Sequence, residues 1–386
     1  MFRNYLLNIK KNIQEKNGIE LAHLLSISQE NQNNQIIKEI QEQNINFEDD
    51  CFKLLPNDWV QIIISHLESL LSISIEQKFQ THSESLNNFL DLARDQTNWL
   101  ISVLQQMAKD LRKLSIHIYK QNKVNEEFLS KAARVLNKCL EITNNDHSSL
   151  ETSKKWGALS IILELFRIYF FTNKLHNCGH FINVVEDSSF PNFENFPIYE
   201  KVTYKYYVGR MHLLSEEYQL AQEDLNYAFQ NCSKKYPKHL KMILFYLVPV
   251  NLYFGKIPSD SLLQKYDLGF YIQIVHSFIK GNVNFYDQEI QKYQTLFLKK
   301  GIFVIFQSIR ILVFRNFMKK FHSIIQNTKI PIEDIQKGLN IIGVDICDNE
   351  IKCILSILIY QERIRGYISY THPFLVLAKK DPFTKF

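Results

Sequence analysis

Apolar side chains recur at α-helical spacing from about residue 58 to the last quarter of the chain. Trp59, Ile62 and Ile63 begin one such stripe at positions i, i+3 and i+4, which place apolar side chains on one helical face. Interruptions are scarce, because the 386 residues include only 11 Gly and 9 Pro, where average usage would give about 46 in total. The sequence therefore predicts an all-α fold of long helices and excludes a β-sandwich with many tight turns.

One segment has the spacing of a known helical repeat. Its small and apolar residues are 12, 4 and 3 positions apart, as in a tetratricopeptide motif with Leu in place of the usual Phe: Gly209, Ala221, Leu225 and Ala228. Two interpretations remain open, a true tetratricopeptide repeat and any other tight pair of antiparallel helices. Both predict helix pairs stacked into a TPR-like α-solenoid.

The chain divides into three predicted segments. Residues 1–50 are polar and rich in Asn and Gln, which predicts small N-terminal helices, and residues 51–298 form the helical-repeat array. In residues 299–386 the pattern changes to three helices followed by two β-prone runs, 367–370 and 374–378, around a His-Pro turn. Three helices and a hairpin are the element order of a winged helix, a fold that binds nucleic acid in some proteins and only other proteins elsewhere.

The positive charge of the chain is concentrated in this last segment. Residues 299–386 contain 14 Lys and Arg against 7 Asp and Glu, and the rest contains 31 against 33, so the whole net charge of +5 arises there. At 100° per residue, Arg315 and Lys319 fall opposite the apolar stripe of their helix and are expected to face solvent, while Arg310 and Lys320 lie nearer the stripe.

Two interpretations of this charge remain open, a phosphate-binding surface and an ordinary solvated face with arginines at a helix end. The candidate nucleic-acid-binding residues are Arg315, Lys319, Lys320, Arg363, Arg365, Lys379 and Lys380.

Catalytic motifs are absent from the sequence, so we expect neither an enzyme nor a cofactor. No phosphate-binding glycine loop, nucleophile elbow or His-Glu-x-x-His occurs. His176 and His180 flank Cys178 at metal-ligand spacing, but Gly179 weakens the helix and no second ligand pair is near, which favours a loop or helix end. The 6 scattered cysteines predict no disulfide framework. No apolar run is long enough for membrane insertion, and we expect an intracellular chain.

Short stretches between residues 150 and 386 match one family in preserved order. They are 153–157, 201–210, 241–244 with 246–247 and 249–250, 301–303, 353–355, 358–360, Arg315-Asn316 with Lys319-Lys320, Arg365-Gly366-Tyr367-Ile368-Ser369, and Pro382-Phe383. On these residues the chain resembles the PCI domain family, a helical repeat ending in a winged helix, and within it the mRNA-export branch found in the TREX-two complex. Residues 1–150 match this branch only in helical character.

The resemblance implies a PCI domain over about residues 200–386 in a non-catalytic adaptor of transcription-coupled mRNA export. It implies a GANP-type scaffold protein with its own PCI region, a small acidic Sem-type subunit and the backbone of RNA or DNA as partners. It also implies a nuclear location at the nuclear pore, with some protein in the cytoplasm. The alternative is a purely structural PCI subunit of a signalosome-associated or proteasome-lid-like assembly.

Overall fold

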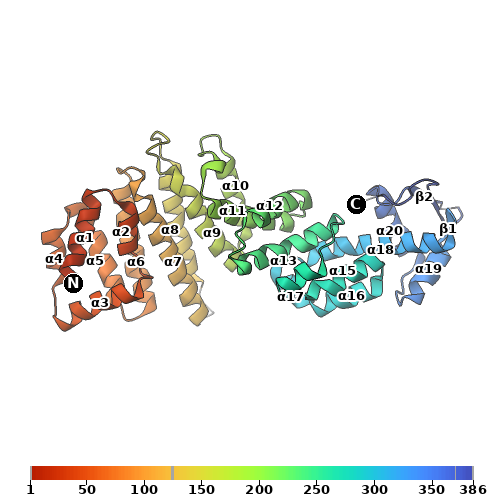
Figure 1. Cartoon of the computed structure of the whole chain (residues 1–386), viewed down its shortest axis with the longest axis horizontal. Coiled ribbons are helices and arrows are strands. Elements are labelled where there is room, and N and C mark those ends of the chain that lie inside the picture. Colours follow the sequence, from red (N-terminus) through yellow and green to blue (C-terminus); the bar gives the residue numbers. More distant parts are fainter. Residues whose placement is uncertain (1, 123–125, 370, 385–386) are drawn as a thin grey trace. The chain divides into compact units, whose positions relative to one another are not determined.

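The computed structural model describes residues 2–122, 126–369 and 371–384, and it confirms an all-α repeat that ends in a winged helix (Figure 1). Internal contacts group the chain into two compact units, Met1–Tyr204 and Lys205–Phe386. The three-segment division made from the sequence stays a prediction.

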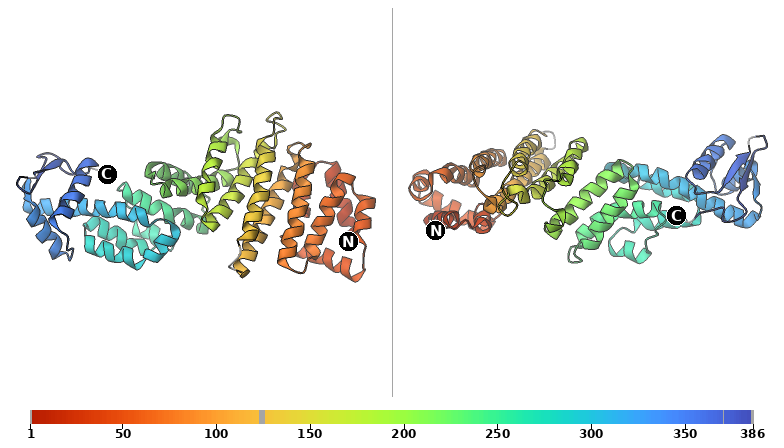
Figure 2. Two further views of the ribbon diagram at one scale, coloured as in Figure 1. Left: turned by 180° about the vertical axis from the view of Figure 1, so that it is seen from behind. Right: turned by 90° about the horizontal axis from the view of Figure 1, so that it is seen from above.

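The first unit is a stack of helices in which each helix from α5 to α9 packs on the one before it in the chain, as both views in Figure 2 show. Small helices occupy its first 50 residues, as expected, and α2 also packs on α7. The elements are α1 (Phe2–Gln14), α2 (Gly18–Leu24), α3 (Glu30–Glu42), α4 (Phe47–Leu54), α5 (Asn57–Leu71), α6 (Ile75–Ala93), α7 (Ile101–Asn122), α8 (Glu127–Asn144), α9 (Ala158–Thr172) and α10 (Gly179–Glu186).

A buried lysine closes the end of α6. The Nζ atom of Lys154 donates hydrogen bonds to the backbone carbonyls of Ala93, Arg94 and Gln96 at 2.9–3.1 Å. These carbonyls belong to the last turn of the helix and the residues beyond it, where no further helical N–H groups are available. The lysine belongs to the 153–157 stretch, so this stretch has a structural role.

The second unit begins within α11 and continues to the C-terminus. Its elements are α11 (Ile198–Leu214), α12 (Tyr218–Asn231), α13 (Pro237–Tyr253), α14 (Asp260–Lys265), α15 (Phe270–Lys280), α16 (Val283–Lys292), α17 (Gln294–Lys300), α18 (Phe303–Ile325), β1 (Lys329–Pro331), α19 (Ile332–Ile341), α20 (Asp348–Tyr360), β2 (Gly366–Ser369) and β3 (Phe374–Leu377). The tight pairing of α11 with α12 is confirmed, because Gly209 of α11 leaves no room for a Cβ atom beside Leu225 of α12, and Ala221, Leu225 and Ala228 are fully buried.

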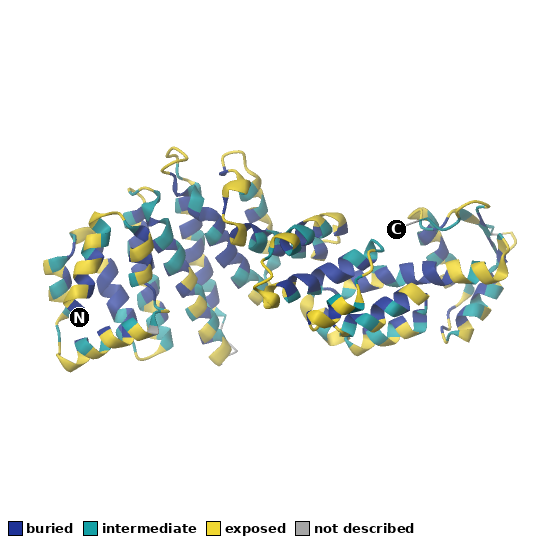
Figure 3. Cartoon of the chain, in the orientation of Figure 1, coloured by how far each residue is buried: buried dark blue, intermediate teal, exposed yellow. Residues whose placement is uncertain are grey.

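Helix α18 is the central element of this unit. It packs against α13, α15, α16 and α17 of the repeat and against α20 of the winged helix. As a result, every residue from Leu312 to Met318 is buried, on all sides of the helix (Figure 3). The repeat and the winged helix therefore share this helix.

The wing is a three-stranded antiparallel sheet with strand order β1-β3-β2. The sequence predicted the hairpin of β2 and β3 but missed β1, because three residues are too few to show an alternating pattern. Tyr370, expected at the end of β2, lies outside the described residues. Of the two sheet faces, one is buried through Ile330, Leu375 and Leu377, and the other is open to solvent.

We expect Gly209→Val to lower the free energy of unfolding by about 1–3 kcal/mol, the usual effect of overpacking. A Cβ atom at Gly209 would lie 2.8 Å from Cγ of Leu225 and 3.1 Å from Cβ of Asp224. Urea unfolding followed by circular dichroism measures the change. Gly269→Val is the control, since a Cβ there meets nothing within 4 Å; equal losses in the two variants would contradict this account of the helix pair.

Two buried histidines make the first unit sensitive to acid. Burial, aided by the neighbouring His82, lowers the pKa of His66 to about 3, and burial also lowers the pKa of His82. The unfolded chain binds protons that the folded chain excludes, so stability falls as the pH drops below about 6.5, by up to about 1.4 kcal/mol per pH unit for His66 and in the same direction for His82. Glu200 acts in the opposite direction, because burial raises its pKa to about 7.

Replacing His66 by Phe isolates this effect, since the contribution of Glu200 is the same in both proteins. We expect the free energy of unfolding of His66→Phe to fall less steeply between about pH 6.5 and pH 4, by up to about 1.4 kcal/mol per pH unit. Urea unfolding at a series of pH values measures the two slopes. Identical slopes would show that His66 takes up its proton in the folded state.

Candidate nucleic-acid interface

The expectation that Arg315 faces solvent is wrong. Only 4% of the residue is exposed, because α18 is covered on the face opposite its apolar stripe as well. Its guanidinium donates to Oδ1 of Asn316 at 2.8 Å and to the backbone carbonyl of Thr384. Burial, followed by the positive charge of Arg363, lowers the pKa of Arg315. Arg315 therefore anchors residues 382–384, which we call the C-terminal segment.

The neighbouring Asn316 ties α18 to the repeat. Its Nδ2 atom donates to the carbonyl of Phe278, in the last turn of α15, at 2.9 Å. Gly281, directly after α15, has a left-handed backbone, and a Cβ there would collide with the backbone nitrogen of Phe317. The Arg315-Asn316 pair thus joins the repeat to the winged helix.

Three of the stretches that carry the family resemblance meet at this anchor. The ring of Phe383 lies 5.8 Å from the Arg315 guanidinium and 5.8 Å from the ring of His322. The backbone N–H of Arg365 donates to the carbonyl of Pro382 at 2.8 Å. Residues 315–316, 365 and 382–383, far apart in the sequence, therefore form one cluster that fixes the C-terminal segment against the wing.

Five of the seven predicted residues are exposed around this segment. They are Lys319, Lys320, Arg365, Lys379 and Lys380, and none of them forms an ion pair with a described residue. Arg363 is half-buried, and Arg310, outside the set, pairs with Asp287 at 2.8 Å. Glu362 and Asp381 lie among these cations and are also exposed. The surface is therefore basic but not uniformly so.

Two residues on the open face of the wing, Lys329 and Tyr367, were not predicted from the sequence. Lys329, Val376 and Tyr367 occupy one row across the sheet. Arg365 directly precedes β2 and is also exposed. Tyr367 is 61% exposed, and an exposed aromatic ring between cations suits the stacking of an unpaired base. The row of Lys329, Val376 and Tyr367 is visible only once β1 is seen to pair with β3. We call Lys329, Arg365 and Tyr367 the wing face.

The predicted loop or helix end at His176 and His180 is what the structure contains. A short 3-10 helix, Leu175–Asn177, precedes α10, and the ring of His180 lies 4.1 Å from that of Phe181. Within residues 2–122, 126–369 and 371–384, no three His, Cys, Asp or Glu side chains gather in a way that could hold a metal ion. Over the same ranges, each helix is too short or too polar to cross a lipid bilayer.

We expect Arg315→Met to lower the free energy of unfolding by about 2–3 kcal/mol, because it leaves buried hydrogen-bond acceptors without their charged donor. Lys319→Met on the same helix is the matched control and should change stability by less than about 0.5 kcal/mol. Urea unfolding of the full chain measures both. A larger loss for Lys319→Met would refute the assignment of Arg315 as the anchor.

Comparison with known proteins agrees with this architecture. The PCI domain family matches residues 290–379, which include α18, the winged helix and the wing. PCI domain-containing protein 2 of Xenopus laevis is 30% identical over 98% of this chain and 96% of its own length. Its Drosophila melanogaster homolog is 31% identical over 98% of this chain and 97% of its own length.

A further relative, Protein CSN12 homolog of Yarrowia lipolytica, is 27% identical over 99% of this chain and 98% of its own length. The family implies membership of a protein complex. Fold, residue matches and full-length similarity together show that the chain belongs to the PCI domain family, among the homologues of PCI domain-containing protein 2.

Proposed function

We propose that this chain is a non-catalytic adaptor subunit of a transcription-coupled mRNA-export complex and binds nucleic acid through its winged helix. The observation that carries the proposal is the wing face, where exposed Tyr367 lies in register with Lys329 and beside Arg365. The exposed lysines 319, 320, 379 and 380 extend the positive surface around it.

The chemistry of this surface favours single-stranded nucleic acid. Lysine and arginine side chains without ion-pair partners attract phosphates, and the attraction weakens with added salt. A tyrosine ring on an open sheet face can stack only on a base that is not already paired. Arg315 is not a contact residue in this proposal, because it is buried. It holds the C-terminal segment, which follows Lys379 and Lys380 in the chain.

Partners and location follow from the family resemblance. We infer that the chain binds a GANP-type scaffold protein carrying its own PCI region and a small acidic Sem-type subunit. Such a complex acts in the nucleus at the nuclear pore, with some protein in the cytoplasm.

Charge reversal tests the nucleic-acid interface. We expect Lys319→Glu, Arg365→Glu and Lys379→Glu together to weaken binding of single-stranded RNA to the full chain by at least about 100-fold at low salt, because phosphate contacts become repulsive. Fluorescence anisotropy measures the dissociation constant at several salt concentrations. The control reverses Lys234, Lys235 and Lys238, which are exposed and outside the winged helix.

A second arm separates stacking from charge. Tyr367→Ala should weaken binding of single strands by about tenfold or more and leave the salt dependence unchanged, since stacking contributes about 1–3 kcal/mol per base. Equal losses in the Lys234, Lys235 and Lys238 control, or an unaltered affinity after reversal of the winged-helix residues, would rule out the interface.

A second candidate function is a purely structural PCI subunit of a signalosome-associated or proteasome-lid-like assembly. It is favoured by the open edge of β2, which among the described strands pairs with β3 alone, and by the name of the Yarrowia lipolytica relative. Affinity purification of the tagged chain separates the two. Recovery of an export scaffold and pore proteins supports the adaptor, and recovery of lid or signalosome subunits supports the structural role.

A further inference from the structure

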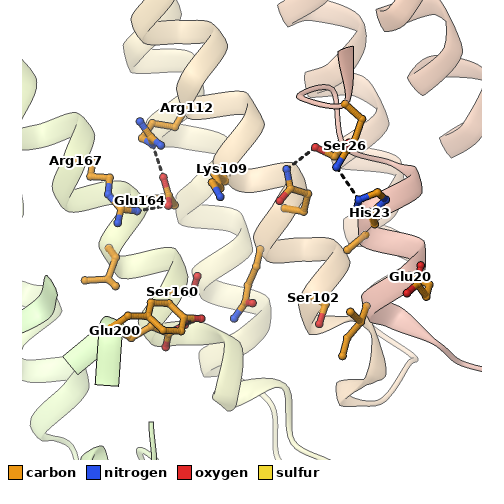
Figure 4. Close-up of a pocket in the computed structure, with 17 residues that line it drawn as sticks. Glu20, His23, Ser26, Ser102, Lys109, Arg112, Ser160, Glu164, Arg167 and Glu200 are labelled. Carbon is orange, nitrogen blue, oxygen red and sulfur yellow. Dashed lines mark hydrogen bonds and ion pairs between the residues drawn. The ribbon is translucent and has the colours of Figure 1, made fainter. Parts of the chain in front are cut away.

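A polar groove in the first unit lies outside the surface described above. It has a volume of about 620 Å³ and lies between α2, α7, α9 and the first turn of α11 (Figure 4). Its floor is one face of α7, where polar side chains recur at positions i, i+3, i+4, i+7 and i+10: Ser102, Gln105, Gln106, Lys109 and Arg112. A groove of this size is large enough for a specific ligand.

One end of the groove is a preformed cationic centre, which we define as Lys109, Arg112, Glu164 and Arg167. Glu164 is only 5% exposed, and its two carboxylate oxygens accept from Nε of Arg112 and from a terminal nitrogen of Arg167. The four side chains carry three positive charges and one negative charge. Figure 4 shows both guanidinium groups turned toward the carboxylate, with Lys109 beside them.

The cationic centre keeps hydrogen-bonding capacity for a ligand. Each guanidinium uses one nitrogen on Glu164, and the other N–H groups of Arg112 and Arg167 have no partner among the described residues. Lys109 is exposed and likewise forms no ion pair within that part of the chain. Because the buried carboxylate already fixes both planar groups, little side-chain entropy remains to be lost when an anion binds.

A phosphate monoester matches this centre in charge and geometry. It carries about −1.5 to −2 charges near neutral pH and three acceptor oxygens, and guanidinium groups bind it through paired hydrogen bonds. A carboxylate carries half the charge and has fewer oxygens. Glu200 also lines the groove, and burial raises its pKa to about 7, so this carboxyl group repels an anion less at neutral pH.

The rest of the groove favours a phosphate attached to a peptide. Ser102 and Arg112 are ten residues apart on α7, or about 15 Å at 1.5 Å per residue, a distance that four or five residues of extended chain span. Ser102, Gln105 and Ser160 line this length, and their side chains make no hydrogen bond to any described residue. They can therefore bind the N–H and C=O groups of a peptide backbone, whereas a free phosphate would leave them unused.

We propose that this groove binds a phosphorylated serine or threonine of a partner polypeptide, with the phosphate at Lys109, Arg112 and Arg167 and the peptide along α7. The site is independent of the winged helix and gives the chain a contact that phosphorylation of the partner would switch on.

The test uses the full chain and a capped undecapeptide with phosphoserine at its centre and alanine elsewhere, labelled for fluorescence anisotropy. The phosphopeptide should bind at least tenfold more tightly than the same peptide with serine. Lys109→Ala should weaken its binding severalfold without changing the melting temperature, because Lys109 is exposed. Arg167→Lys, which keeps the charge but loses the planar group, should weaken it similarly. Lys120→Ala, an exposed lysine of α7 outside the groove, is the matched control.

Three results would overturn the proposal. The first is equal affinity for the phosphorylated and unphosphorylated peptides, which would leave the cationic centre a purely structural ion-pair network. The second is an equal effect of Lys109→Ala and Lys120→Ala. The third is displacement of the phosphopeptide by inorganic phosphate or inositol hexakisphosphate at the same concentration as by unlabelled phosphopeptide, which would show that the peptide contributes nothing.

Discussion

The second unit depends on the burial of α18 around its whole circumference. A helix covered on one side needs one apolar stripe, but α18 is covered by repeat helices and by α20, so residues from Leu312 to Met318 are all removed from water. Two polar residues in this run must then find partners inside the protein. Asn316 bonds the end of α15, and Arg315 bonds the C-terminal segment.

This anchoring links the core of the unit to its surface. Because the carbonyl of Pro382 accepts from the backbone of Arg365 and Phe383 lies beside Arg315, the C-terminal segment is held against the start of β2. The exposed lysines next to that segment therefore lie near the open face of the wing. Buried Arg315 thus helps to position exposed cations nearby, although its own side chain is not on the surface. This explains how it can belong to a stretch that matches the family and yet have a structural role.

Two buried charges in the first unit have different roles. Lys154 is satisfied by three backbone carbonyls and closes a helix, so it leaves nothing for a ligand. Glu164 instead holds two arginines at the edge of a groove, and their other N–H groups have no partner among the residues that the structure describes. The difference decides which buried charge is purely structural and which one prepares a binding site.

Apolar spacing, the scarcity of glycine and proline, and the location of the positive charge were sufficient to predict the helical repeat, the winged helix and its basic character. These features depend on local periodicity and on residue counts, and both can be obtained from the sequence. The burial of Arg315, the strand β1 and the row that joins Lys329 to Tyr367 could not be predicted, because each depends on contacts between residues far apart in the chain. A helical wheel gives the angle of Arg315 relative to the apolar stripe, but only the tertiary structure decides whether a side chain at that angle faces water or another part of the protein.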